Sequence, residues 1–310
     1  MSLELPARPR LATTPEDGLL EGPRVLRPVP DRAYRLFTLR PLGRVIGAEI
    51  DGVDLGASPN PRLRAELNQA LLDWKVLFFR DQHLTPERQR AFARQWGELE
   101  TNPFIPPGDS AEVVRFSRDA TMPGFENIWH TDVTWRPEPA LGSVLRLIEV
   151  PPVGGDTIWA DMAAAYDNLP PEVRERIDGR TAVHDFVPGF ARFTDPELLA
   201  AHQDRFPPVE HPVVRIHPET GRRTLFVNQA FTTHIVGLGK SESDRLLRYL
   251  FQQAHVPEYQ VRFRWTPGAV AFWDNRATQH YAVNDYHPHA RVAERVAIAG
   301  DRPYGPNLEP

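Results

Sequence analysis

Residues 141–161, LGSVLRLIEVPPVGGDTIWAD, decide the fold class of this chain. Two short apolar runs, 141–150 and 156–161, are separated by Pro and Gly, which interrupt regular structure. Their β-branched and aromatic residues favour strands over helices. Similar runs occur at residues 112–117, 212–217, 224–228, 260–265, 269–274 and 291–300. We therefore expect a mainly β protein with helical insertions, whose core is a double-stranded β-helix, or jelly roll.

The domain organisation follows from a change of composition near residue 35. Residues 1–35 are rich in Pro and charge and lack periodicity, which predicts a flexible or loosely docked N-terminal arm. Residues 36–310 are expected to form a single jelly-roll domain, since a β-structure of this size is often one domain. Helical spacing of apolar residues is expected at 61–75, 85–97, 161–179, 195–204 and 241–254.

The composition excludes several classes of site. The chain has no Cys, which rules out disulfides, thiolate nucleophiles, zinc–thiolate sites and iron–sulfur clusters. Any metal must be bound by His and carboxylate side chains. The net charge of −5 argues against generic binding to nucleic acid or to a membrane surface. There is no apolar run long enough for a membrane span and no signal-peptide pattern, so we expect a cytoplasmic protein.

Three His-X-carboxylate pairs are candidate metal-binding motifs, because residues two apart on an extended segment point to the same side. His202 and Asp204 lie in a predicted helix, where residues two apart diverge. His217 and Glu219 lie in the predicted hairpin turn at 217–222, where solvent exposure is expected. His130 and Asp132 lie in NIWHTDVTW, an apolar segment that we predict to be extended.

His280 is the best-placed third ligand, because it follows the apolar strand predicted at 269–274. Two His and one carboxylate on one face of an ion form the facial triad of non-haem Fe(II) oxygenases, which leaves the opposite face open. The spacing alone leaves two alternatives open. His130, Asp132 and His280 could be hydrogen-bonded core residues, or they could bind zinc with a water completing the shell.

Two cations on the last predicted strand share one face. Arg291 and Arg295 are four residues apart in RVAERVAIAG, so both side chains point to the same side of an otherwise apolar strand. A buried guanidinium requires an anion. Two anionic ligands would satisfy them, and internal ion pairs to Asp or Glu are the alternative.

Five segments together resemble the taurine dioxygenase family of 2-oxoglutarate-dependent oxygenases. They are WHTDVTW, GGDTIWAD, LFVNQAFTT, WDNRATQHYA and HARVAERVAIAGDRP, in an order and spacing that match the family along about residues 35–305. The resemblance implies that Fe(II) is bound by His130, Asp132 and His280, with O₂ as oxidant. It also implies that Thr157 and Arg291 bind the far carboxylate of 2-oxoglutarate. Arg295 is then expected to bind the anionic head of the substrate.

The resemblance implies an anionic substrate, with an alkyl sulfate or sulfonate as the favoured class. Hydroxylation beside the sulfur group would release an aldehyde with sulfate or sulfite. Taurine itself is disfavoured, because Asn102, Ile105 and Glu126 stand where taurine enzymes of the family place other polar residues. Ile105, Phe104 and Phe190 are expected to build an apolar wall for a longer chain or an aryl group, although core packing would explain them equally well.

Other functions remain compatible with the motifs. The same chemistry could act on an aryloxyalkanoate or on a natural-product carboxylic acid, because a carboxylate also pairs with a guanidinium. A zinc hydrolase and a non-catalytic metal- or anion-binding jelly roll are the alternatives from other classes. We also expect a homo-oligomer, either a dimer or a tetramer.

Overall fold

Two facing β-sheets form the core of the structure, a computed structural model that describes residues 24–101, 111–121, 124, 126–191 and 195–306. Phe78 of the larger sheet stacks on Phe263 of the smaller one, with ring centroids 4.0 Å apart. Within this part of the chain, the larger sheet has the order β1(Thr38–Pro41), β2(Ala48–Asp51), β3(Val76–Phe79), β13(Val270–Asp274), β5(Gly142–Glu149), β15(Arg291–Ile298), β4(Val114–Arg118). The smaller sheet has the order β12(Gln260–Phe263), β6(Thr157–Asp161), β14(Thr278–Ala282). The expected mainly β, jelly-roll class is confirmed.

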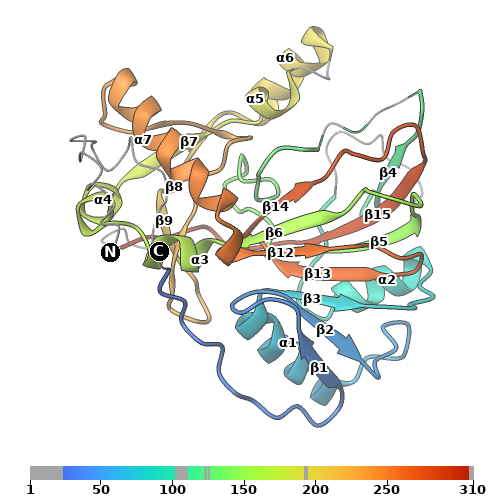
Figure 1. The fold of residues 1–310 in the computed structure, drawn as a ribbon. Helices are drawn as coiled ribbons and strands as arrows, with labels where there is room; N and C mark the ends of the chain where they lie inside the picture. Colours follow the sequence, from blue (N-terminus) through green and yellow to red (C-terminus); the bar gives the residue numbers. More distant parts are fainter. Residues whose placement is uncertain (1–23, 102–110, 122–123, 125, 192–194, 307–310) are drawn as a thin grey trace, which may run out of the picture.

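The larger sheet is covered on both faces, which explains why β3 and β13 are buried along their whole length. Alternate residues of a strand point to opposite sides. Phe78 therefore faces the smaller sheet, whereas Phe79 faces the helices and packs against Phe92, with ring centroids 6.4 Å apart. Figure 1 shows α1 and α2 on the side of this sheet that faces away from β6 and β14.

Helices α1(Pro61–Trp74) and α2(Pro86–Ala93) begin as their sequences predict. The Asn60 side chain accepts hydrogen bonds from the backbone amides of Arg62 and Leu63, and Thr85 accepts one from Arg88. Each helix has Pro in its first turn, where the missing amide costs no hydrogen bond. Leu67, Leu71 and Trp74 then bury the inner face of α1. The remaining helices are α3(Met162–Asp167), α4(Pro171–Ile177), α5(Val187–Phe190), α6(Pro196–Arg205), α7(Lys240–Gln252) and the 3₁₀ turns η1(Gln253–His255) and η2(Pro257–Tyr259).

The insertions between the core strands carry two small sheets. The predicted hairpin is present as β9(Val214–Ile216) paired with β10(Arg223–Leu225). A second sheet has the order β11(Thr232–Ile235), β7(Thr181–His184), β8(Val209–Pro212). Its strands were not expected, because they are short and polar residues interrupt them. Helices α5 and α6 extend from this part of the molecule, on the opposite side from α1 (Figure 1).

The described part of the N-terminal segment has no regular structure from residue 24 to 34, but it is held by polar contacts. The backbone amide of Val25 donates to the Asn168 side chain at 2.8 Å, and Arg27 forms an ion pair with Asp167 at 2.9 Å. Arg32 forms another with Asp73. In the described ranges, no helix is long and apolar enough to cross a membrane.

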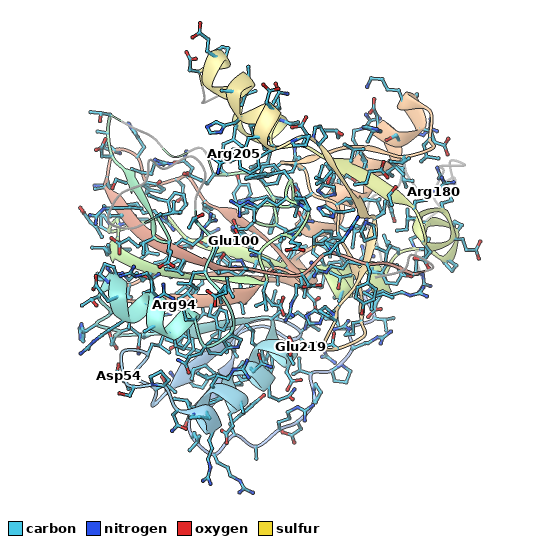
Figure 2. All side chains as sticks on the ribbon, turned by 180° about the vertical axis from the view of Figure 1, so that it is seen from behind. Asp54, Arg94, Glu100, Arg180, Arg205 and Glu219 are labelled. Atoms are coloured by element: carbon cyan, nitrogen blue, oxygen red, sulfur yellow. The ribbon has the colours of Figure 1, made fainter. Side chains whose placement is uncertain are left out.

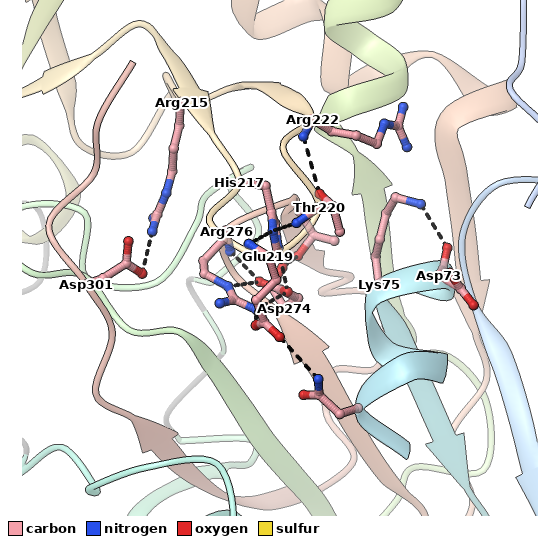
Figure 3. A network of polar contacts seen from close by, with 12 residues as sticks. Asp73, Lys75, Arg215, His217, Glu219, Thr220, Arg222, Asp274, Arg276 and Asp301 are labelled. Atoms are coloured by element: carbon pink, nitrogen blue, oxygen red, sulfur yellow. Dashed lines mark hydrogen bonds and ion pairs between the residues drawn. The ribbon is translucent and has the colours of Figure 1, made fainter. Parts of the chain in front are cut away.

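A buried polar network lies where β13 ends (Figure 3). The Asp274 carboxylate accepts hydrogen bonds from the guanidinium of Arg276 at 2.8 and 2.9 Å and from Nε2 of His217 at 2.9 Å. Glu219 of the β9–β10 turn also contacts Arg276, at 2.8 Å. The expectation that His217 is solvent-exposed in its turn is therefore wrong: it is 2 % exposed. The cause is that the turn folds back onto the end of β13, where Asp274 needs donors.

Candidate active site

His130, Asp132 and His280 come together at one point, with one ligand atom from each within 4.8 Å of the others. Nε2 of His130 lies 3.8 Å from Oδ1 of Asp132, and Nε2 of His280 lies 3.9 Å from the same oxygen. The centroids of the two imidazole rings are 4.1 Å apart. His280 is far from His130 in the sequence. The two meet because β14, which carries His280, runs beside the segment that carries His130.

The segment around Asp132 is less extended than the sequence predicted. Only His130 pairs with β14, as an isolated bridge to His280, and residues 132–135 form a turn. Val133 has φ 48°, in the left-handed region that a β-branched residue rarely adopts. The expectation that the whole segment is extended is wrong beyond Thr131, because aromatic and β-branched composition does not reveal this turn. Strained residues of this kind cluster at functional sites.

Further contacts orient the candidate ligands. Nδ1 of His130 donates to the carbonyl of Ile128 at 2.8 Å, so its Nε2 carries the free lone pair. Ser143 donates to Oδ2 of Asp132 at 2.9 Å, which leaves Oδ1 facing the two imidazoles. Hydrogen bonds to the outer atom of a ligand are typical of metal sites, because they fix the tautomer and the orientation.

The charges of the three side chains suit a divalent metal. Burial lowers the pKa of His130, and burial together with the nearby His130 ring lowers the pKa of His280 well below its usual range. Burial alone would raise the pKa of Asp132, but the Arg295 guanidinium and the two imidazoles outweigh it and hold that pKa well below its usual range. Two neutral imidazoles and one carboxylate are the donor set of a facial triad, so the residues present fit Fe(II).

A cavity of about 360 Å³ opens beside these ligands. Alternate residues of β15 line it, namely Arg291, Ala293, Arg295 and Ala297, so the predicted shared face of the two Arg is present. The neighbouring strand β4 contributes Val114, Phe116 and Arg118. Within the described ranges, apolar and aromatic residues also line it: Ile128, Val133, Trp135, Leu145, Trp159, Phe190, Ala230, Phe231 and Trp273.

Arg291 has donors available for an anion. It is 8 % exposed, and its Nε donates to the carbonyl of Gly155 at 3.1 Å. Its Nη2 is buried and has no hydrogen-bond partner among the residues that the structure describes. Thr157 lines the same cavity, and its hydroxyl accepts a hydrogen bond from Trp265 at 3.0 Å, so its own proton can be donated elsewhere. A buried guanidinium with an unused donor fits a carboxylate.

Gly155 allows Arg291 its position. The backbone there has φ 71°, and a Cβ would lie 3.2 Å from Cδ of Arg291 and 3.0 Å from Pro151. A larger residue would press on the guanidinium stem as well as strain the turn. The GGDT segment therefore contributes to the cavity in two ways. Thr157 lines it directly, and Gly155 leaves the space that the Arg291 side chain occupies.

Arg295 lies against the candidate metal ligands. Its Nη1 donates to Oδ1 of Asp132, and its guanidinium stacks over the ring of Phe116, 5.3 Å from the centroid. Its Nε is buried without a hydrogen-bond partner in the described ranges. The sequence left open whether Arg295 binds an external anion or forms an internal ion pair. The structure shows such a pair, and its partner, Asp132, is also a candidate metal ligand.

The other predicted substrate residues are placed as follows. Glu126 lines the cavity and forms an ion pair with Arg118. Phe190 lines it from α5 and packs against Phe231, with ring centroids 6.0 Å apart. Asn102 and Ile105, together with Phe104, lie outside the described residues.

Several charged residues of the cavity were missed from the sequence. Arg118 lies opposite Arg291 in the β4–β15 register, and Arg136 forms an ion pair with Glu100 at 3.2 Å. Figure 2 shows Glu100 near the middle of the molecule. Burial raises the pKa of Glu100, and the nearby Arg136 opposes that shift. Alternation along VRFSR would have placed Arg118 on the face of Val114, but its pairing with β15 could not be foreseen.

The two rejected His-X-carboxylate pairs do not form metal clusters in the described residues. His202 and Asp204 lie in α6, as expected. His217 is hydrogen-bonded to Asp274, as described above.

Comparisons with known proteins agree with this geometry. The family model described as "Taurine catabolism dioxygenase TauD, TfdA family" matches residues 38–297. An alpha-ketoglutarate-dependent sulfate ester dioxygenase of Pseudomonas putida is 40% identical over 277 residues, which are 86% of this chain and 91% of that protein. An alkylsulfatase of Acinetobacter baylyi is 38% identical over 272 residues, 85% of each protein. The crystal structure of a taurine dioxygenase from Burkholderia xenovorans has a TM-score of 0.77 at 39% identity, and covers 89% of this chain and 95% of that one.

This likeness decides between the reaction classes that the motifs left open. Alpha-ketoglutarate is 2-oxoglutarate, and the family uses it with Fe(II) and O₂. A zinc hydrolase and a non-catalytic binding protein are therefore set aside. The chain belongs to the TauD/TfdA family and is a 2-oxoglutarate-dependent, non-haem iron dioxygenase.

Proposed function

We propose that this enzyme oxidises an alkyl sulfate or an alkyl sulfonate at the carbon next to the sulfur group, releasing an aldehyde with sulfate or sulfite. The observation that carries the proposal is the position of Arg295. It faces the same cavity as His130, Asp132 and His280 and lies in contact with one of them. An anion held there would present its adjacent carbon to the metal.

His130, Asp132 and His280 would hold the Fe(II), each through the atom that faces the other two. Bound iron would supply the activation of O₂ and the oxidation of the substrate C–H bond, with 2-oxoglutarate converted to succinate and CO₂. The protein's contribution is to hold the three ligands in place, to orient the substrate and to exclude water.

Arg291 and Thr157 would bind the far carboxylate of 2-oxoglutarate. The unused Nη2 of Arg291 and the hydroxyl of Thr157 face one cavity. A guanidinium and a hydroxyl together satisfy a carboxylate, and the charge-assisted bonds are the stronger ones. The co-substrate would then lie beside β15 and β6, which carry Arg291 and Thr157, in the cavity that His280 of β14 also lines.

The charges of the cavity favour a singly charged anion as the prime substrate, which binds in addition to 2-oxoglutarate. The metal, Asp132, the doubly negative co-substrate and Arg291 together carry no net charge. Arg295 then keeps one positive charge, which an alkyl sulfate or sulfonate would balance. The other charged residues of the described wall are paired already: Arg118 with Glu126, Arg136 with Glu100, and Arg94 with Glu112.

The wall around Arg295 favours an apolar substrate body. Phe116, Phe190 and Phe231 line the cavity and give it aromatic surface beside Arg295 and His130. Glu126 is engaged by Arg118 and is therefore not free to bind the ammonium group of taurine. An ammonium group placed against this apolar wall would lose its hydration without gaining a partner.

The reaction balances without a further reagent. One oxygen atom of O₂ enters the substrate as a hydroxyl on the carbon that bears the sulfate ester, and the other enters succinate. The hydroxylated carbon then expels sulfate, its C–O bond to the ester breaks, and the hydroxyl loses its proton to leave an aldehyde. With a sulfonate, the C–S bond breaks and sulfite leaves.

The test is succinate formation with a panel of prime substrates: medium-chain alkyl sulfates, alkyl and aryl sulfonates, taurine, phenoxyacetate and 2-phenoxypropionate. We expect the alkyl sulfates or the longer sulfonates to be turned over with the highest kcat/KM, and sulfate or sulfite to be released in equal amount to succinate. A preference for taurine would refute the proposed substrate. A preference for the phenoxy acids would replace it with the carboxylate alternative, which Arg295 could also bind.

We further propose a cytoplasmic homo-oligomer, either a dimer or a tetramer. The absence of Cys is compatible with a reducing compartment. Light scattering on the purified protein tests the assembly, and a monomer at micromolar concentration would contradict it.

A further inference from the structure

Thr131 connects the strand that carries one candidate ligand to the segment that carries the other two. It stands between His130 and Asp132, and its hydroxyl donates a 2.7 Å hydrogen bond to the backbone carbonyl of Thr278. Thr278 is the first residue of β14, which carries His280. Thr131 is 4 % exposed, so water does not compete for this bond.

The backbone pairing explains why a side chain is needed there. His130 and His280 exchange both of their backbone hydrogen bonds, at 3.1 and 2.8 Å. If this antiparallel ladder continued, its next bond would run from the amide of Asp132 to the carbonyl of Thr278. The ladder stops after one bridge because the chain turns at residue 132.

The hydroxyl of Thr131 donates to the very carbonyl that a continued ladder would use. A side chain thus replaces a backbone bond, and Asp132 can leave the strand direction and aim its carboxylate at the two imidazoles. Two attachments, one at His130 and one at Thr131, fix both the distance and the rotation between the segment and β14. Without the Thr131 bond, the segment would be held to β14 at His130 alone.

We propose that Thr131 is a positioning residue that sets the relative placement of the three metal ligands. Metal sites tolerate only small departures from their preferred bond lengths, so a loosened attachment weakens binding. The inference rests on the metal role assigned under Proposed function. It concerns the separation of the ligands and does not depend on the prime substrate.

The experiment measures Co(II) binding to the metal-free enzyme from its visible absorption, which needs no turnover. Thr131→Val keeps the shape and removes the donor, whereas Thr131→Ser keeps the donor. Thr224→Val is the matched control, because Thr224 is 1 % exposed, lies on β10, and its hydroxyl has no hydrogen-bond partner among the described residues. Urea unfolding of each metal-free variant reports whether stability alone has changed.

We expect Thr131→Val to bind Co(II) about 10- to 100-fold more weakly, the usual effect of removing an outer contact of a metal site. Thr131→Ser and Thr224→Val should bind it as the parent does. Equal Co(II) affinity in Thr131→Val and the parent would overturn the inference, even if the variant were less stable. If Thr131→Val does not fold, Thr131→Ala decides the question by the same titration, with Thr131→Ser as its rescue.

Failure of the proposed function gives a different result. If the parent enzyme bound no Co(II) at this site, or if His280→Ala bound it equally well, the metal assignment itself would fail. If the parent binds and Thr131→Val binds equally, only the role of Thr131 fails.

Discussion

Arg295 donates a hydrogen bond to Asp132, so the candidate substrate-binding cation touches a candidate metal ligand. The contact follows from the register of β15, which places Arg295 in the row that lines the cavity, and from the turn that aims Asp132 inward. A guanidinium beside a carboxylate holds the pKa of Asp132 low and keeps it ready to bind a cation. The substrate anion would thus be held within a side chain's length of the metal.

Arg295→Ala should raise KM for the prime substrate roughly 10- to 100-fold, the equivalent of a lost hydrogen bond to a charged group. KM for 2-oxoglutarate should stay near the parent value, because Arg291 is a separate side chain on the same face of β15, beyond Ala293. The check is steady-state succinate formation with each substrate varied in turn. Arg115→Ala is the control, since Arg115 lies on β4 but pairs with Glu294 on the face away from the cavity. An unchanged KM for the prime substrate in Arg295→Ala would contradict the assignment.

Arg291→Ala should affect the KM for 2-oxoglutarate and leave the KM for the prime substrate near the parent value. It removes the buried donors proposed for the far carboxylate of 2-oxoglutarate, so KM for this co-substrate should rise roughly 10- to 100-fold. Arg291→Lys should recover only part of the loss, because an ammonium group cannot provide the two parallel bonds of a guanidinium. The measurement is succinate formation at saturating prime substrate. If KM for 2-oxoglutarate were unaffected, Arg291 would have no part in binding it.

Much of the site could be predicted because strand periodicity is simple. The four-residue spacing of Arg291 and Arg295 was enough to put both in one cavity, and the composition of residues 141–161 was enough for the sheet. The third ligand required more, since the 149 residues between His130 and His280 give no direct information on whether the two side chains are in contact. The resemblance to a family supplied that step.

The failures have a common physical cause, which is that long-range contacts decide local conformation. Nothing near His217 in the sequence shows that its turn folds onto Asp274 and buries it. Nothing near Val133 shows the left-handed turn that ends the pairing of His130. Arg118 was missed because its place beside Arg291 depends on which strand β4 joins.

Stability should fall in mild acid because of His211. Burial lowers its pKa from the ordinary 6.5 to about 4, and its Nε2 donates to the carbonyl of Arg136 at 2.9 Å. Between those pH values the unfolded chain binds a proton that the folded chain does not. The free energy of unfolding should therefore decrease as the pH falls through this window, by up to about 1.4 kcal/mol per pH unit for this one group.

Urea unfolding at pH 7.5, 6.0 and 5.0 measures this slope. His211→Gln keeps a donor for Arg136 and cannot be protonated, so its slope should be smaller than that of the parent. His184, whose ring lies 5.2 Å away, also has its pKa lowered by burial, so part of the slope should remain. Equal slopes in His211→Gln and the parent would show that His211 is not responsible.

Asp274→Asn should be strongly destabilising, by about 3–5 kcal/mol, because it leaves the charge of Arg276 buried without its main partner. Arg276 and His217 together outweigh burial and hold the pKa of Asp274 well below its usual range, so it is the charged form that they bind. Urea unfolding measures the loss. Asp244→Asn is the control, since its pair with Lys240 lies on the surface of α7 and contributes about 0.3–0.5 kcal/mol. A similar loss in both variants would mean that the network in Figure 3 adds little.

The central claim is that His130, Asp132 and His280 hold a metal with an open face on which 2-oxoglutarate binds. It is tested most directly by adding Fe(II) and then 2-oxoglutarate to the enzyme without oxygen, and recording the visible spectrum. The account predicts a weak charge-transfer band that appears only when both are present, is lost in His280→Ala, and needs more 2-oxoglutarate in Arg291→Ala. A parent enzyme without the band, or a His280→Ala variant that retains it, would contradict the account.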